Sequence, residues 1–213
     1  MSTSEAGSPP GPASGTPKLT DDVEIWLVRH GETEWSAAGK HTSTTDLPLT
    51  DAGERQARAL APLLAGLAPS LVLCSPRRRA VDTARLAGLT VEETSEDLVE
   101  WAYGRYEGRT THEIRTEHPG WSIWADGVPD GESHEQVTER ADRVLGRAAL
   151  ALDDGPVVLV GHGHFSRVLG ARWLGLPAAG GAHLLLGTAA PSILGAQYGA
   201  PAIKRWNLPN PAA

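Results

Sequence analysis

The strongest constraint on the fold is a set of three short apolar segments, each of which ends abruptly in polar residues. The segments span residues 23–28, 70–75 and 156–160, and the stretches between them carry apolar residues at helical spacing. An apolar run of this length is typical of a buried strand. Strands that alternate with helices predict a single α/β domain, built as a three-layer α/β/α sandwich with a largely parallel central sheet.

Helices between these strands are predicted from periodicity and capping residues. Thr50 can cap a helix that starts at Asp51, and Pro62 within that pattern predicts a kink or a break. Pro76 is placed to begin the helix that follows the second strand. Further helices are predicted over 110–117, 133–152 and 164–174, and further strands over 90–93, 184–186, 192–194 and 202–204.

Composition limits the partners that we expect. The chain has 213 residues and a net charge of −7, so neither nucleic acid nor an anionic membrane surface is an expected partner. Cys74 is the only cysteine, which excludes an intrachain disulfide. No apolar run approaches the roughly 20 residues of a membrane-spanning helix, and the first 20 residues lack the apolar segment of a signal peptide. We therefore expect a small-molecule ligand and a cytoplasmic location.

The two ends of the chain differ in composition from its middle. Residues 1–20 are dominated by Ser, Gly, Pro, Ala and Thr, which predicts a disordered N-terminal tail. Residues 207–213 are expected to form a loose C-terminal tail. The folded domain is then predicted to span residues 21–206. The sequence is compatible with a homodimer, although it sets no oligomeric state.

Histidine and arginine residues follow the apolar segments at the points where the strands end. Arg29 and His30 follow the first strand, and His162 follows the third between two glycines. The run Arg77–Arg79 follows the second, and three consecutive arginines cannot all face one crevice. Taken singly, Arg29-His30-Gly31 is equally well explained by a polar loop. A tight turn is slightly favoured for the His162 motif, and a solvated surface role is favoured for any one arginine of the run. Because ligands bind beyond the carboxyl ends of parallel strands, their convergence predicts an oxyanion pocket suited to phosphate.

The segment Leu27–Thr33 is similar to the signature of the histidine phosphatase superfamily, which includes the cofactor-dependent phosphoglycerate mutases. The resemblance extends from about Glu24 to about Ala196, and its further blocks follow in the family's order: Asp46–Gly53, Gln56-Ala57, Ser75-Pro76, Arg79-Ala80, Thr83-Ala84, Leu98–Glu100, Tyr103-Gly104, Glu107-Gly108, Gly131–Ser133 and Gly161–Gly163. The resemblance implies a metal-independent phosphomonoester hydrolase that acts through a phosphohistidine on a small phosphorylated metabolite, with no cofactor.

The same resemblance implies roles for individual residues. His30 would be the nucleophile, and Glu100 would be the general acid and later the base. The phosphoryl oxygens would be held by Arg29, Arg79 and His162. The expected substrate-binding set is completed by Gly163, Ser36, Thr42 and Ser43.

Two departures from the family pattern bear on which substrate is bound. Ser36 stands where many members have an asparagine that touches phosphate, and Thr42-Ser43 replaces a common Thr-Gly pair. No residues have convincing metal-ligand spacing, because no carboxylate or cysteine joins His162 and His164.

Aromatic residues gather in the segment after Glu100. Most are expected to pack in the core or a lid, with one or two lining a pocket: Trp101, Tyr103, Tyr106, Trp121 and Trp124. His41, His112 and His164 are expected to be structural, although His164 follows the pocket glycine and is placed to touch substrate.

Three functions remain open from the sequence. A phosphatase is favoured over a mutase, because only 62 positions separate Glu100 from His162 and nothing between them resembles the mutase cap. A non-catalytic phosphate-binding regulatory module is the third hypothesis, and the presence of both His30 and Glu100 speaks against it.

Overall fold

A six-stranded sheet forms the centre of the protein, whose computed structural model describes residues 19–212. The strand order is β3-β2-β4-β1-β5-β6, in which β3, β2, β4 and β1 are parallel. β5 pairs antiparallel with β1, and β6 pairs antiparallel with β5. The strands are β1 (Ile25–Arg29), β2 (Leu71–Cys74), β3 (Glu93–Thr94), β4 (Val157–Gly161), β5 (Pro191–Gln197) and β6 (Ala200–Arg205). The predicted largely parallel sheet is therefore confirmed.

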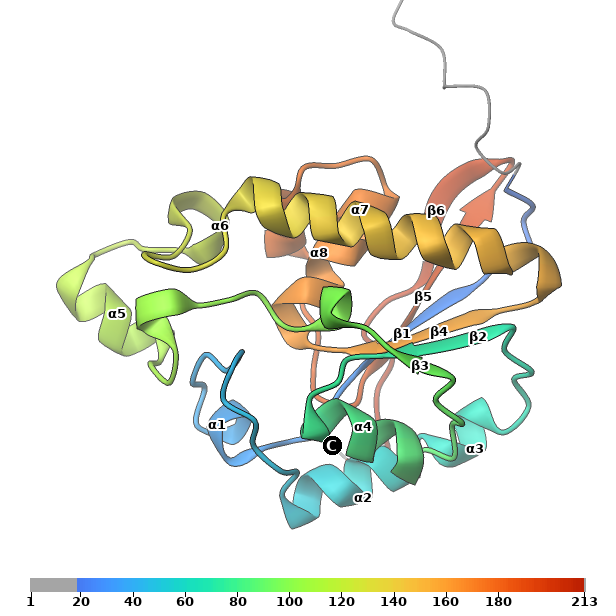
Figure 1. Cartoon of the computed structure of the whole chain (residues 1–213), viewed down its shortest axis with the longest axis horizontal. Coiled ribbons are helices and arrows are strands. Elements are labelled where there is room, and N and C mark those ends of the chain that lie inside the picture. The colour runs from blue at the N-terminus through green and yellow to red at the C-terminus, as the bar shows by residue number, and fades with distance from the viewer. Residues whose placement is uncertain (1–18, 213) are drawn as a thin grey trace, which may run out of the picture.

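Helices cover both faces of this sheet (Figure 1). On one face lie α2 (Asp51–Ala59), α3 (Ala61–Leu64) and α4 (Arg78–Leu86), and on the other lie α7 (His134–Ala151) and α8 (Gly163–Trp173). Shorter helices lie beyond the carboxyl ends of the parallel strands: α1 (Glu34–Ala37), α5 (Thr111–Glu117) and α6 (Ile123–Asp126). The 3-10 turns are η1 (Glu96–Leu98), η2 (Gly104–Tyr106), η3 (Leu152–Asp154) and η4 (Ala178–His183).

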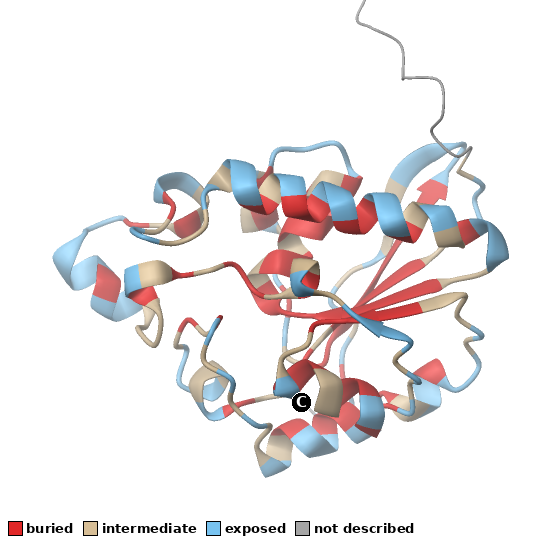
Figure 2. Ribbon diagram, viewed as in Figure 1, coloured by how far each residue is buried: buried red, intermediate tan, exposed pale blue. Residues whose placement is uncertain are grey.

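The central parallel strands β1, β2 and β4 are almost wholly apolar because each face of the sheet packs on its own core. In β1, Ile25 and Leu27 join the cluster beneath α7 and α8, whereas Trp26 and Val28 join the cluster beneath α2 and α4. Successive side chains of a strand point to opposite faces, so a strand covered on both sides has no solvent-facing position. Figure 2 shows the result as buried strands flanked by helices whose exposed faces point outward.

The structure agrees with most predicted elements and corrects some. Pro62 lies at the start of α3, and the helical pattern breaks at Leu60 between α2 and α3. The strand predicted over 184–186 is wrong. The carbonyl oxygens of Leu185 and Leu186 accept from the side chains of Trp206 and Arg29 instead of from a neighbouring strand.

A tail is predicted at each end of the chain. The N-terminal tail lies almost wholly outside the described residues. In the segment predicted to be loose, Asn210 is 7% exposed and donates to two backbone carbonyls, so the chain is anchored at that residue. Within residues 19–212, no helix is both long and apolar enough to cross a membrane.

Candidate active site

The loop after β1 is held by close backbone contacts that only glycine permits. A Cβ atom on Gly31 would lie 2.4 Å from the carbonyl oxygen of Gly53, at the start of α2. The Gly31 amide donates to Oγ1 of Thr83 in α4 (2.9 Å), and this hydroxyl donates to the Arg79 carbonyl (2.7 Å). The loop that carries His30 is thus clamped between two helices.

His30 is held in one protonation and tautomeric state. Its Nδ1 lies 2.7 Å from the carbonyl oxygen of Gly31, which can only accept, so the ring proton resides on Nδ1 and Nε2 keeps its lone pair. The ring is 4% exposed. Burial, with the nearby charges of Arg29 and Arg79, lowers the pKa of His30 well below 6.5. The imidazole is therefore neutral and available as a nucleophile at neutral pH.

Arg29 and His162 lie at the N-terminus of α8. The Arg29 guanidinium is 3.2 Å from the position that a Cβ on Gly163 would take, and its Nη1 donates to the Leu186 carbonyl (2.6 Å). His162 is the N-cap residue of α8 and is fully buried, with its ring centroid 5.2 Å from that of His30. Its Nε2 lies 2.8 Å from Oγ of Ser75. Burial is the main cause that lowers the pKa of His162 well below 6.5.

Arg79 is the one arginine of its run that is fully buried. It donates to the carbonyls of Thr45 (2.9 Å), Ser43 (3.1 Å) and Thr42 (3.4 Å). The loop that supplies these carbonyls is held by Glu107, whose carboxylate accepts from the amides of Ser43 and Thr45.

The other two arginines of the run lie at the surface. The Arg78 side chain is 65% exposed and pairs with Asp82. The Arg77 side chain is 27% exposed and lies 3.7 Å from Glu96. Helical spacing thus sends only Arg79 toward the strand ends.

Glu100 is 5% exposed and lies against the N-terminus of α8. Its Oε1 accepts from the amides of Trp101 (2.9 Å) and Phe165 (2.8 Å), and its Oε2 accepts from the amide of His164 (3.0 Å). These bonds place the carboxyl group on the helix end that Arg29 also faces. Burial and the charge of Glu100 raise the pKa of Tyr103, whose hydroxyl is 2.6 Å from Nδ1 of His164.

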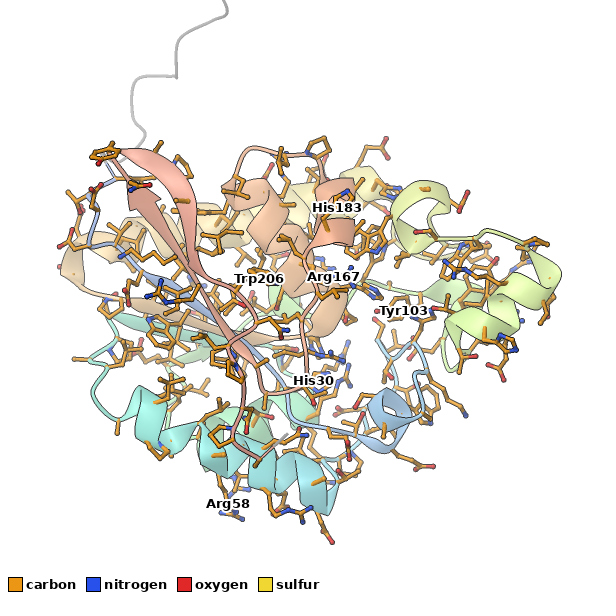
Figure 3. The ribbon with its side chains drawn as sticks, turned by 180° about the vertical axis from the view of Figure 1, so that it is seen from behind. His30, Arg58, Tyr103, Arg167, His183 and Trp206 are labelled. Carbon is orange, nitrogen blue, oxygen red and sulfur yellow. The ribbon has the colours of Figure 1, made fainter. Side chains whose placement is uncertain are left out.

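A cleft of about 240 Å³ opens over these groups. Figure 3 shows His30, Tyr103 and Arg167 converging on it from separate segments. The lining residues are Arg29, His30, Ser36, Gly39, Lys40, His41, Thr42, Glu100, Tyr103, Thr111, Gly163, His164, Arg167 and Leu186. Arg79 and His162 are fully buried beside His30 and do not line the cleft itself.

The cleft includes three of the four additional residues expected to bind substrate. Gly163, Ser36 and Thr42 line it, but the Ser36 hydroxyl is engaged in capping α1, with Thr33 as its partner. Ser43 lies elsewhere. It is 3% exposed, and its hydroxyl donates to the Glu100 carbonyl. Ser43 therefore shapes the loop that holds Arg79.

Three charged residues of the site were not assigned a role from the sequence. Arg167 follows Gly163 by four residues on α8, so helical spacing from the glycine could have found it. Glu107 lies in one of the blocks that resemble the family. Its hydrogen bonds to the loop that contains Ser43 join residues more than 60 positions apart in sequence. Lys40 lies in an irregular segment with no periodicity to indicate its direction.

The site is suited to an anion. Within residues 19–212, buried nitrogen atoms without a hydrogen-bond partner include Nε of Arg29, Nε of Arg79 and Nδ1 of His162. A buried polar atom without a partner is costly, and a bound oxyanion would satisfy such atoms. In the same part of the chain, no group of three or more His, Cys, Asp or Glu side chains could hold a metal ion.

Known proteins are similar to this chain in sequence and in fold. The family model described as histidine phosphatase superfamily (branch 1) matches residues 25–209. An acid phosphatase of Mycobacterium tuberculosis is 47% identical over 177 residues, covering 82% of this chain and 87% of that protein. A sedoheptulose 1,7-bisphosphatase of Saccharomyces cerevisiae is 35% identical over 185 residues, covering 70% and 67%. The solved structure of an open reading frame product from M. tuberculosis matches with a TM-score of 0.86 and 44% identity, covering 89% and 99%.

Proposed function

The chain belongs to branch 1 of the histidine phosphatase superfamily, and from this membership we propose that it hydrolyses small phosphomonoesters through a phosphohistidine on His30. The observation that carries the proposal is the hydrogen bond from Nδ1 of His30 to the Gly31 carbonyl. It leaves Nε2 unprotonated in a cleft that the cations Arg29, Lys40 and Arg167 also line. Such a nitrogen can attack phosphorus in line, and the ester bond to the leaving oxygen then breaks.

Arginine and histidine donors would stabilise the charge on the transferring phosphoryl group. Arg29 and Arg79 each retain a buried Nε–H without a partner. The Ser75 hydroxyl can donate a hydrogen bond to Nε2 of His162. The ring proton of His162 is then on Nδ1, which has no partner and is a further donor. Donors that are held in place before reaction cost no reorganisation when charge develops, so they lower the barrier to transfer.

Glu100 is the proposed proton donor to the leaving alkoxide, and then the base for the attacking water. Its Oε1 accepts from two amides, whereas its Oε2 accepts from one, so Oε2 is the oxygen with spare capacity for a proton. Glu100 lines the cleft together with His30, as the two roles require.

The proposal is tested by incubating the protein with an aryl phosphate in excess chelator and measuring inorganic phosphate. We expect release to continue in chelator and to cease in His30→Ala. An alkaline quench during turnover should recover phosphohistidine from the wild type but not from His30→Ala. His112→Ala is the matched control, because His112 is exposed on α5. Activity that disappears in chelator and returns with a divalent ion would contradict the proposal.

A phosphoglycerate mutase differs from the proposed hydrolase in the group that accepts the phosphoryl group. A mutase returns the phosphoryl group to a second hydroxyl of the substrate, whereas the proposed hydrolase delivers it to water. Running the reaction in ¹⁸O-labelled water and finding the label in inorganic phosphate supports the hydrolase. The cytoplasmic location and the homodimer stay predictions, to be checked by cell fractionation and by sedimentation.

A further inference from the structure

Three cations border the cleft without an acidic partner. None of the ion pairs within residues 19–212 includes Arg29, Lys40 or Arg167. All three line the cleft, in a chain whose net charge is −7. A cation that an acidic protein leaves unpaired beside a ligand cleft is available to bind a ligand anion.

The proposed phosphoryl chemistry uses only part of this positive charge. Arg79 already forms an ion pair with Asp46 (3.8 Å). The two negative charges of a phosphomonoester dianion would then be balanced by two of the three cations Arg29, Lys40 and Arg167. Glu100 must carry a proton to act as the acid, so it contributes no negative charge at that stage. One positive charge is left over, and because Arg29 adjoins His30, it belongs to Arg167 or Lys40, which line the cleft together with the proposed acid Glu100.

Arg167 is held in a fixed orientation. Its Nε donates to the Gly181 carbonyl (2.9 Å) and its Nη2 to the Ala182 carbonyl (3.1 Å), while the guanidinium stacks on Trp124 with its carbon 4.5 Å from the ring centroid. Within the described part of the chain, its Nη1 has no acceptor. The side chain is thereby pre-positioned with one donor edge free, which limits the entropy lost when it binds an anion.

The spacing along α8 places Arg167 on the face of the helix that Arg29 contacts. Arg29 lies against Gly163 at the first residue of the helix, and Arg167 follows four residues later on the same face. Both side chains line one cleft of about 240 Å³, so the two anionic groups of a bound ester must lie close together. Lys40 borders the same cleft from the loop after α1, where its ammonium lies 5.6 Å from the Trp35 ring centroid.

We propose that Arg167, assisted by Lys40, binds a second anionic group on the leaving alcohol, so that the preferred substrates are phosphomonoesters of acidic alcohols. The group is a carboxylate or a second phosphate, separated from the ester oxygen by a short carbon chain. This inference rests on the proposed phosphatase function and specifies its substrate class.

The first test compares esters that differ only in the second group. 3-Phosphoglycerate and glycerol 3-phosphate have the same carbon chain, but the first ends in a carboxylate and the second in a hydroxymethyl group. We expect kcat/KM to be at least about tenfold higher for 3-phosphoglycerate, a modest effect for one charge-assisted hydrogen bond. Propane-1,3-diol bisphosphate tests whether a second phosphate is preferred to a carboxylate. Equal or higher kcat/KM for glycerol 3-phosphate than for both acidic esters would overturn the inference.

The second test assigns the preference to its residues. Arg167→Gln should reduce the ratio of kcat/KM for acidic over neutral ester to near unity, mainly through KM of the acidic ester. Arg167→Lys should keep part of the ratio, and Lys40→Gln should reduce it less. Arg172→Gln is the control on the same helix, because Arg172 pairs with Asp142 away from the cleft, and it should leave the ratio unchanged. A ratio that survives both Arg167→Gln and Lys40→Gln would also overturn the inference.

Failure of the inference is distinguishable from failure of the proposed function. If glycerol 3-phosphate and an aryl phosphate are hydrolysed without any acidic preference, the phosphatase stands and the second site falls. If no ester is hydrolysed and His30 is never phosphorylated, the phosphatase itself is refuted. Should Arg167→Gln fail to fold, the wild-type comparison and Lys40→Gln still decide the question.

Discussion

The side-chain amide of Asn210 donates to the carbonyl of Gln56 (2.9 Å), which ties the C-terminal segment to α2. The same Nδ2 donates to the carbonyl of Ala189, whose amide lies within 3.1 Å of the carbonyls of Arg29 and His30. Gln56 in turn accepts from the Glu32 amide. Ala189 has a φ of 48°, a strained conformation for a residue with a side chain. Asn210 thus stabilises the backbone on both sides of His30.

Replacing Asn210 should therefore affect both stability and catalysis. Asn210→Ala leaves two backbone carbonyls without their donor, which should lower the free energy of unfolding by about 2–3 kcal/mol. We expect kcat to fall more than KM rises, because the loop that carries His30 would shift while the arginines proposed to bind phosphate stay in place. Urea titration and steady-state kinetics check the two effects. Asn210→Asp keeps the shape but removes the donor, and wild-type behaviour in that variant would contradict this explanation.

Arg79 and Arg77 should differ strongly, although they are two residues apart. Arg79→Ala removes a buried donor of the proposed oxyanion site, so kcat should fall on the order of 10²–10³-fold. Arg77→Ala removes a side chain that is 27% exposed and does not line the cleft, so kcat should change much less. Steady-state assays on an aryl phosphate, with thermal melts to confirm folding, compare the pair. Equal losses would refute the placement of Arg79 in the oxyanion site.

Glu100→Gln should separate phosphorylation of the enzyme from its hydrolysis. The variant keeps the shape of the side chain but loses proton transfer. An aryl phosphate has a good leaving group, so it should still phosphorylate His30, whereas an alkyl phosphate should react very slowly. Rapid mixing and an alkaline quench should show a stoichiometric burst of phosphohistidine with the aryl ester. If both esters slow equally and no phosphoenzyme forms, the acid–base role passes to another carboxylate, such as Glu32 or Glu107.

Acid should destabilise the protein through its buried histidines. Burial lowers the pKa of His41 from 6.5 to about 4, and the pKa values of His30, His162 and His164 lie well below 6.5. Below pH 6.5 the unfolded chain binds protons that the folded chain does not, so the free energy of unfolding falls as pH falls. His41 alone would contribute a loss of up to roughly 3 kcal/mol by pH 4.

Urea unfolding between pH 4 and 7 measures this dependence. His41→Gln should make the slope of stability against pH shallower between pH 4 and 6.5, whatever its effect at pH 7. His112→Gln, at an exposed position, should leave the slope unchanged. A wild-type stability that is flat across this range would contradict the assignment of neutral buried histidines.

Sequence alone determined the layered sheet and the identity of the residues at its edge. An apolar run such as Val157–Val160 has apolar side chains on both faces of the strand, and two helical layers bury both faces. Parallel strands also place their carboxyl ends at one edge of the sheet. The break at Leu60 also follows from a local feature, because Pro62 is poorly tolerated in the interior of a helix. These features depend on residues near one another in the chain, which is why they could be read directly.

Only the tertiary structure decided the features that depend on distant contacts. The Gly31 carbonyl that fixes the proton on Nδ1 of His30 belongs to a loop held by Gly53 and Thr83, which are distant in sequence. The burial of Arg79 likewise depends on carbonyls more than 30 residues away. Leu184–Leu186 appears strand-like in sequence, yet side-chain donors from Arg29 and Trp206 take up its carbonyls, so it does not form a strand. Hydrogen bonds of this kind join segments with no shared pattern, and the positions of their partners exist only once the chain has folded.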